Sequence, residues 1–178
     1  MQFNFIILSI ALVATTLAYP IADQERGMFE EEELREGIEL IKNLSPAAKE
    51  GVEAIHKNVD QTRSAEEAAY DAFFAGATVT AADKTAYESF KAFVTTKETE
   101  LLNAIDTAIA SSPLTETQKA LYTTCKNIYA NKNLSIKQVK EDLKSAADAA
   151  DQINAGDRKA VETFIMETIK SQIKGASA

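Results

Sequence analysis

Two polar segments of this chain carry oxygen-bearing side chains at spacings that could hold a cation. In the first, residues 56–67, four side chains fall at the third, fifth, ninth and twelfth places of a twelve-residue loop: Asn58, Asp60, Ser64 and Glu67. A helix–loop–helix calcium loop draws on these places, with a bidentate Glu at the twelfth and Gly at the sixth. Gln61 stands at the glycine place and only two of the four side chains are carboxylates, so we expect weak binding of Mg²⁺ or Ca²⁺ through waters.

The second segment, residues 127–138, repeats this pattern without its acids. It offers Asn127, Asn131, Ser135 and Gln138, with Lys132 at the glycine place. Aligning "AIHKNVDQTRSAEEA" with "NIYANKNLSIKQV" puts Ile55 over Ile128 and Asn58 over Asn131. In this alignment the expected helix caps, Ser64 and Ser135, match only if the first segment is two residues longer than the second. The repeat predicts two helix–loop–helix units, of which the first is the better cation candidate.

Asn133-Leu134-Ser135 is also an N-glycosylation sequon, as is Asn43-Leu44-Ser45. Pro46 follows the first sequon directly and should hinder transfer of a glycan. The second sequon has no such obstacle, but Ser135 is also an expected helix cap. Asn133 is therefore the candidate glycosylation site, and its accessibility in the fold decides the matter.

The sequence offers no catalytic constellation. His56 is the only histidine, which rules out a multi-histidine metal site, and there is neither a Gly-rich phosphate loop nor a Gly-flanked nucleophile turn. At the end of an expected helix, a histidine more commonly interacts with the helix dipole than performs chemistry. Cys125, the single cysteine, shares a face with Leu121 and Ile128, which favours a small buried hydrophobe over an intermolecular disulfide. We predict a protein that is not an enzyme.

Helices must position these residues. Their start signals divide the chain into six or seven expected helices. The starts are Ser45-Pro46, Ser64 with Glu67, Thr80 with Asp83, Ser112-Pro113, Ser135 with Gln138, and Asp157. Gly76 stands where a left-handed C-terminal residue belongs. From Thr80 to about Ser111 a single stripe follows the 3.6-residue period: Tyr87, Phe90, Val94, Leu101, Ile105 and Ile109.

No segment shows β-alternation, and the chain has no Trp, three Pro and six Gly. These observations predict an all-α fold, a single bundle of helix–loop–helix pairs around a long central helix.

The first residues, "MQFNFIILSIALVATTLAYP", have the apolar run and small-residue end of a secretory signal peptide. We expect residues 1–18 to be the leader, 19–42 an acidic segment or helix, and 43–174 the helical domain of a secreted, extracellular protein. Residues 23–39 hold eight of the acids against two arginines, and the net charge of the chain is −8. Without a basic stripe we expect no nucleic-acid partner, and no second apolar run is long enough for a transmembrane segment.

Three stretches of the chain resemble the nematode SXP/RAL family of secreted antigens, which includes anisakid allergens. They are "NLSPAAKEGVEAIHKN", "YESFKAFVTTKETELLNAIDTAI" and "SPLTETQKALYTTCKNIYANKNLSIKQVKEDL". The resemblance implies an all-helical, cation-binding domain that is exported and immunogenic in hosts. We expect a non-enzymatic interaction protein whose partner is an unknown protein or host factor. Within the family pattern Ser135 and Gln138 match the second cap, where an acid is common, and Ser64 and Glu67 match the first, with Arg63 in place of the usual Leu.

An alternative resemblance is to the nematode fatty-acid and retinol-binding proteins, through "SIKQVKEDLKSAADAADQINAGDRKAVETF". That family implies a secreted helical carrier of a small lipid. Five phenylalanines could line its cavity: Phe73, Phe74, Phe90, Phe93 and Phe164. An aromatic stripe at helical spacing more often belongs to the core, and the sequence leaves both interpretations open.

Overall fold

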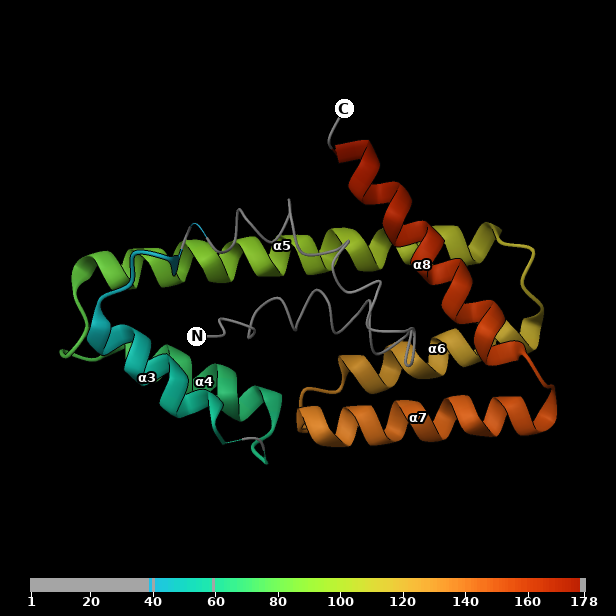
Figure 1. The fold of residues 1–178 in the computed structure, drawn as a ribbon, viewed down its shortest axis with the longest axis horizontal. Helices are drawn as coiled ribbons and strands as arrows, with labels where there is room; N and C mark the ends of the chain where they lie inside the picture. The colour runs from blue at the N-terminus through green and yellow to red at the C-terminus, as the bar shows by residue number, and fades with distance from the viewer. Residues whose placement is uncertain (1–38, 40, 59, 177–178) are drawn as a thin grey trace.

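The computed structural model describes residues 39, 41–58 and 60–176, and these form an all-α bundle, as predicted. The expected signal peptide and most of the acidic segment lie outside the described residues. The six helices described are α3 (Pro46–His56), α4 (Arg63–Ala75), α5 (Ala81–Ser111), α6 (Glu116–Ala130), α7 (Ile136–Ile153) and α8 (Asp157–Ala176). Helix α5 runs the length of the bundle; α3 and α4 lie at its N-terminal end, and α8 crosses it near the other end, where it packs on α6 and α7 (Figure 1).

Three of the predicted helix starts are confirmed by their hydrogen bonds. Ser45 Oγ accepts from the amide of Ala48, with Pro46 in the first helical turn. Thr80 with Asp83 and Ser135 with Gln138 form capping boxes, in which each side chain bonds the other residue's backbone N–H. These local pairs satisfy amides that a helix start otherwise leaves without a partner.

Two predicted starts are wrong. Helix α4 is capped by Thr62, whose Oγ1 accepts from the amide of Ala65, and not by Ser64. Helix α6 is capped by a box of Thr115 and Gln118, whereas Ser112 ends α5. In both places the sequence offers several hydroxyls within a few residues, and contacts with other parts of the chain select among them.

Gly76 also differs from its prediction. It ends α4 with an ordinary φ of −63°, so the left-handed conformation is not used there. The described glycine with a positive φ, 96°, is Gly156, in the turn between α7 and α8.

The buried apolar side chains form two separate clusters, and α5 contributes to both. Phe90 of α5 packs with Phe74 and Val79 in the first cluster, around α3 and α4. Ile105 and Ile109 of α5 pack in the second cluster with buried side chains of α6, α7 and α8. The single stripe predicted along α5 therefore serves two cores, one toward each end of the helix.

Gly51 in the middle of α3 permits a close approach to α4. A Cβ at this position would lie 2.0 Å from the ring of Phe73, a distance that no real contact shows. The absence of a side chain thus lets Phe73 pack against the α3 backbone, which fixes the α3–α4 hairpin and the loop between its helices.

Asp83 joins two helix starts. Its carboxylate accepts from the Ser45 amide at 2.7 Å and the Ser45 hydroxyl at 2.8 Å, and also from the amide and hydroxyl of Thr80. The side chain is buried, and these donors hold the pKa of Asp83 well below its usual range, the Ser45 backbone N–H contributing most. Asp157 plays a similar part at the other end of the chain, where it accepts from Gln118 and Asn154.

Candidate functional site

The two polar loops lie against each other and are joined by backbone hydrogen bonds. Thr62 and Ser135 form an antiparallel bridge. The amide of Arg63 donates to Leu134 O at 3.1 Å, and the amide of Ser64 donates to Lys132 O at 2.9 Å. These two amides belong to the first turn of α4 and have no partner within their own helix, so the second loop completes the start of α4.

The bridge corrects the register of the internal repeat. Thr62 and Ser135 are 73 positions apart, as are Ile55 and Ile128, so no length difference separates the loops. Both residues cap the helix that follows, each through the amide three residues on. The counterpart of Gln138 is consequently Ala65, and Glu67 lies two residues beyond it on α4. Likewise the residue before the first cap is Gln61, and Arg63 follows that cap.

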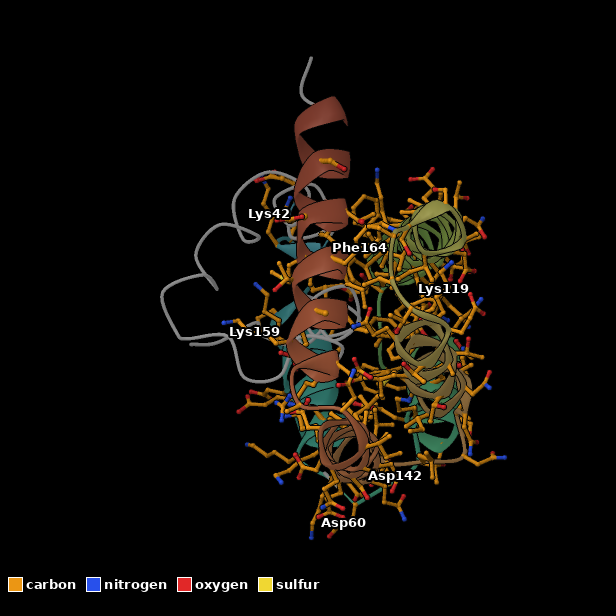
Figure 2. The ribbon with its side chains drawn as sticks, turned by 90° about the vertical axis from the view of Figure 1, so that its right-hand side faces the viewer. Lys42, Asp60, Lys119, Asp142, Lys159 and Phe164 are labelled. Atoms are coloured by element: carbon orange, nitrogen blue, oxygen red, sulfur yellow. The ribbon has the colours of Figure 1, made fainter. Side chains whose placement is uncertain are left out.

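The structure separates the four candidate ligands of the first loop into two pairs. Asn58 and Asp60 are exposed, and in the described part of the chain their side chains have neither a hydrogen bond nor an ion pair. Asp60 projects at the edge of the molecule (Figure 2). Ser64 and Glu67 are already engaged: the Ser64 hydroxyl lies 3.2 Å from that of Thr62, and Glu67 Oε1 accepts from Lys132 Nζ at 2.7 Å.

Several polar side chains of the second loop are engaged within the protein. Asn131 Oδ1 accepts from the amide of Asn133, and Gln138 Oε1 accepts from the amide of Ser135 at 2.8 Å. The hydroxyl of Tyr129 donates to Glu98 on α5. In the ranges that the structure describes, no group of three or more His, Cys, Asp or Glu side chains is placed to hold a metal. The second loop therefore brings no cluster of carboxylate, imidazole or thiol ligands together among the described residues.

A hollow of about 450 Å³ opens beside the first loop, between it and the first turns of α7. One side is lined by His56, Asn58, Gln61 and Glu66, the other by Ile136, Lys137, Lys140 and Glu141. His56 Nδ1 lies 3.6 Å from Glu66 Oε1. Burial lowers the pKa of His56 and raises the pKa of Glu66, because both charged forms lose water there.

Asn133, the candidate glycosylation site, is exposed on the second loop. Its partner in the sequon, Ser135, is buried and accepts from the amide of Gln138. A glycan on Asn133 would therefore extend into solvent without disturbing the cap, provided that transfer precedes folding.

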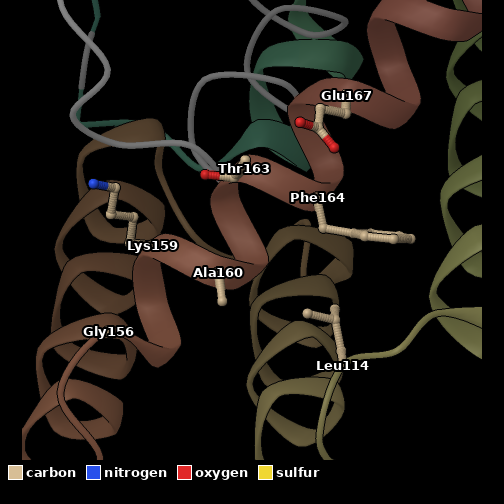
Figure 3. Close-up of a pocket in the computed structure, with 7 residues that line it drawn as sticks. All are labelled: Leu114, Gly156, Lys159, Ala160, Thr163, Phe164 and Glu167. Atoms are coloured by element: carbon tan, nitrogen blue, oxygen red, sulfur yellow. The ribbon is translucent and has the colours of Figure 1, made fainter.

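A second hollow of about 410 Å³ lies between α8 and the connection from α5 to α6. Leu114 and Phe164 form its apolar side, while Lys159, Thr163 and Glu167 follow α8 (Figure 3). The phenylalanines proposed to line one lipid cavity do not gather here. Phe73, Phe74 and Phe90 belong to the first core, and Phe164 packs against the second.

Cys125 is buried in the second core, as its place on the apolar stripe predicts. Burial raises the pKa of its thiol to about 11, so the reactive thiolate is scarce at neutral pH.

The feature that sequence reasoning missed is the use of basic side chains in the loop pair. Lys132 reaches Glu67, and the guanidinium of Arg63 reaches the carbonyl oxygens at the end of α6. Local spacing could not reveal the role of Arg63, because its partners are more than 60 positions away.

Comparison with known proteins matches these loops and helices to one family. The model of the SXP/RAL-2 family protein Ani s 5-like, metal-binding domain matches residues 1–174. No curated protein and no solved structure matches the chain. In the described part of the chain no helix is both long and apolar enough to cross a membrane. Because the match spans nearly the whole chain and agrees with the all-helical fold, the chain belongs to the SXP/RAL-2 family and carries its Ani s 5-like metal-binding domain.

Proposed function

We propose that this protein is an exported, non-enzymatic helical interaction protein whose first loop binds a divalent cation weakly. The observation that carries the cation binding is that the side chains of Asn58 and Asp60 are exposed and have no hydrogen bond or ion pair among the described residues. One carboxylate and one amide oxygen suit an ion that retains most of its waters, as Mg²⁺ does. Glu67 would join them only if Lys132 released it.

Titration calorimetry with MgCl₂ and CaCl₂ tests this site. We expect a weak binding heat with a Kd of roughly 1 mM, the weak end of oxygen-ligand sites, and its loss in Asp60→Ala. Glu67→Ala should keep the heat, since this carboxylate is held by Lys132. Asp142→Ala removes an exposed acid of α7 and is the matched control. Silence of the natural protein at millimolar ion, or a normal heat in Asp60→Ala, would reject the site.

Export rests on the leader-like residues 1–18, and it has a direct test. Expression of the full chain in a eukaryotic secretory host should deliver protein to the medium that begins at Tyr19. Retention in the cell, or an intact N-terminus, would contradict it. The same preparation shows by its mass whether Asn133 carries a glycan.

The non-enzymatic role is supported by the chemistry of the hollow beside the first loop. It contains the single histidine of the chain, His56, next to Glu66. Among the described residues, no Ser, Thr, Cys or Tyr side chain lines it. The imidazole–carboxylate pair therefore has no hydroxyl or thiol beside it to activate as a nucleophile. The partner we envisage is a protein or host factor that contacts the exposed polar surface.

A further inference from the structure

Arg63 crosses from the first helix–loop–helix unit to the second. Its Nη2 donates to the carbonyl oxygen of Tyr129 and, at 3.2 Å, to that of Asn131. Its guanidinium carbon lies 4.8 Å from the centroid of the Tyr129 ring, within the range of a cation–π contact. Its Nε is buried and has no hydrogen-bond partner in the described part of the chain. The half-buried guanidinium is therefore bound to oxygen atoms of the second unit.

The two carbonyl groups that Arg63 contacts lie at a helix end, where a positive charge is stabilising. Tyr129 is near the C-terminus of α6, and Asn131 is its C-cap. The last carbonyl groups of a helix lack partners within the helix, and they form the negative end of its dipole. A helix–loop–helix calcium loop also presents its oxygens immediately after the first helix. In this chain a guanidinium already bonds these oxygens.

Lys132 makes the reciprocal crossing, from the second loop to the first unit. Its Nζ lies 2.7 Å from Glu67 Oε1, with both side chains about half exposed. The backbone of the same residue accepts from the amide of Ser64. Each unit thus contributes one positively charged side chain that bonds oxygen atoms of the opposite unit, close to the backbone bridge between Thr62 and Ser135.

We propose that Arg63, assisted by Lys132, takes the place of a divalent ion in the loop pair. The loops of this chain are then joined permanently, and the second loop binds no metal. The inference does not depend on cation binding by Asn58 and Asp60, whose side chains bond neither Arg63 nor Lys132 in the described part of the chain. It distinguishes this chain from a switch whose helices reorient when an ion binds.

Hydrogen exchange of the full mature chain, followed by mass spectrometry of peptides over 60–66 and 131–136, tests the proposal. In the natural protein the protection of these peptides should be the same within about twofold in EDTA and in millimolar MgCl₂ or CaCl₂. Arg63→Met, which keeps the stem but not the charge, should speed their exchange at least about tenfold, because two carbonyl groups lose their donor. Its Tm should fall by roughly 5 °C.

Arg158→Met is the matched control, since Arg158 also forms ion pairs, with Glu162 and Asp148, but contacts neither loop. It should leave exchange at both loop peptides unchanged. If Arg63→Met does not fold, Arg63→Lys gives the answer: it keeps the charge but loses the planar fork, and should exchange faster than the natural protein with unchanged circular dichroism.

Two outcomes would overturn the proposal. One is protection of the 131–136 peptide that rises with added ion by more than about twofold in Asp60→Ala, which would place the ion in the loop pair and not at Asn58 and Asp60. The other is unchanged loop protection in a folded Arg63 variant. A calorimetric titration without heat, in contrast, removes the first-loop site and leaves this inference standing.

Discussion

At the residue scale, charged side chains that make several hydrogen bonds between helix ends fix how the elements of this bundle meet. Asp83 receives four hydrogen bonds from two helix starts that are far apart in sequence. The half-buried guanidinium of Arg63 similarly donates to a carbonyl oxygen at the C-terminal end of α6, in the other unit. A buried charge is tolerated only where such partners replace water, so each of these residues restricts how two elements can meet.

The ionised form of Asp83 should stabilise the fold, which predicts a pH-dependent effect of Asp83→Asn. The pKa of Asp83 is lower in the folded protein than its ordinary value of 3.8. The unfolded chain therefore binds the proton first as the pH falls, and the stabilisation is complete above about pH 4 and declines below it. At pH 7 the variant should melt roughly 5 °C lower, because the single carbonyl oxygen of an amide cannot accept all four hydrogen bonds from Ser45 and Thr80.

Thermal unfolding followed by circular dichroism between pH 7 and pH 2 measures this effect. The difference in Tm between the natural protein and Asp83→Asn should shrink as the pH drops below about 4. Asp142→Asn, a change at an exposed position of α7, is the control and should show little difference at any pH. A constant gap across the whole range would show that the charge of Asp83 is not what stabilises the two starts.

At the scale of elements, the start of α4 is decided by the loop of the other unit. The amides of Arg63 and Ser64 bond to Leu134 O and Lys132 O, and the amide of Ala65 bonds to Thr62 Oγ1. The first three amides of the helix are thereby satisfied, two of them by a segment about 70 positions away. This leaves Thr62, and not Ser64, as the residue whose side chain caps the helix.

A pair of neighbouring substitutions distinguishes the two hydroxyls. Thr62→Ala should lower the free energy of unfolding by about 1 kcal/mol, the usual cost of losing an N-cap. Ser64→Ala, inside the first turn, should change it by less than about 0.5 kcal/mol. Urea unfolding with an unchanged m-value provides both numbers. Equal losses, or a larger loss for Ser64→Ala, would restore the predicted start at Ser64.

At the scale of the whole molecule, two cores share one long helix. The section of α5 between them, Thr95–Glu100, carries polar and charged side chains, and Glu98 accepts from the hydroxyl of Tyr129. The paired loops provide a second link between the two units, away from α5. Because the apolar side chains are divided in this way, the described residues do not assemble the five phenylalanines around one space.

This division predicts that the protein does not carry lipids. A fluorescent fatty-acid probe and retinol, each titrated with micromolar protein, should show neither enhanced nor blue-shifted emission. A known fatty-acid carrier titrated in parallel is the positive control. Saturable, blue-shifted emission would favour the carrier function instead, and its loss in Phe164→Ala but not in Phe93→Ala would place the ligand in the hollow beside α8.

The sequence by itself determined the features that depend on neighbours within one or two helical turns. The all-α class, the starts at Ser45, Thr80 and Ser135, and the apolar faces around Ile105 and Cys125 all follow from side chains that act on their own helix. The family resemblance came from the order of such local motifs, and the family match confirms it.

Only the tertiary structure decided the features that join distant segments. The start of α4 at Thr62, the split of the α5 stripe into two cores, and the crossing of Arg63 to the end of α6 involve partners tens of positions apart. Local spacing holds no information on such partners, because a cap or a charge is equally favourable at several nearby positions until another element approaches. In this protein the approach of the second loop selects Thr62 as the cap and Arg63 as the cation of the loop pair.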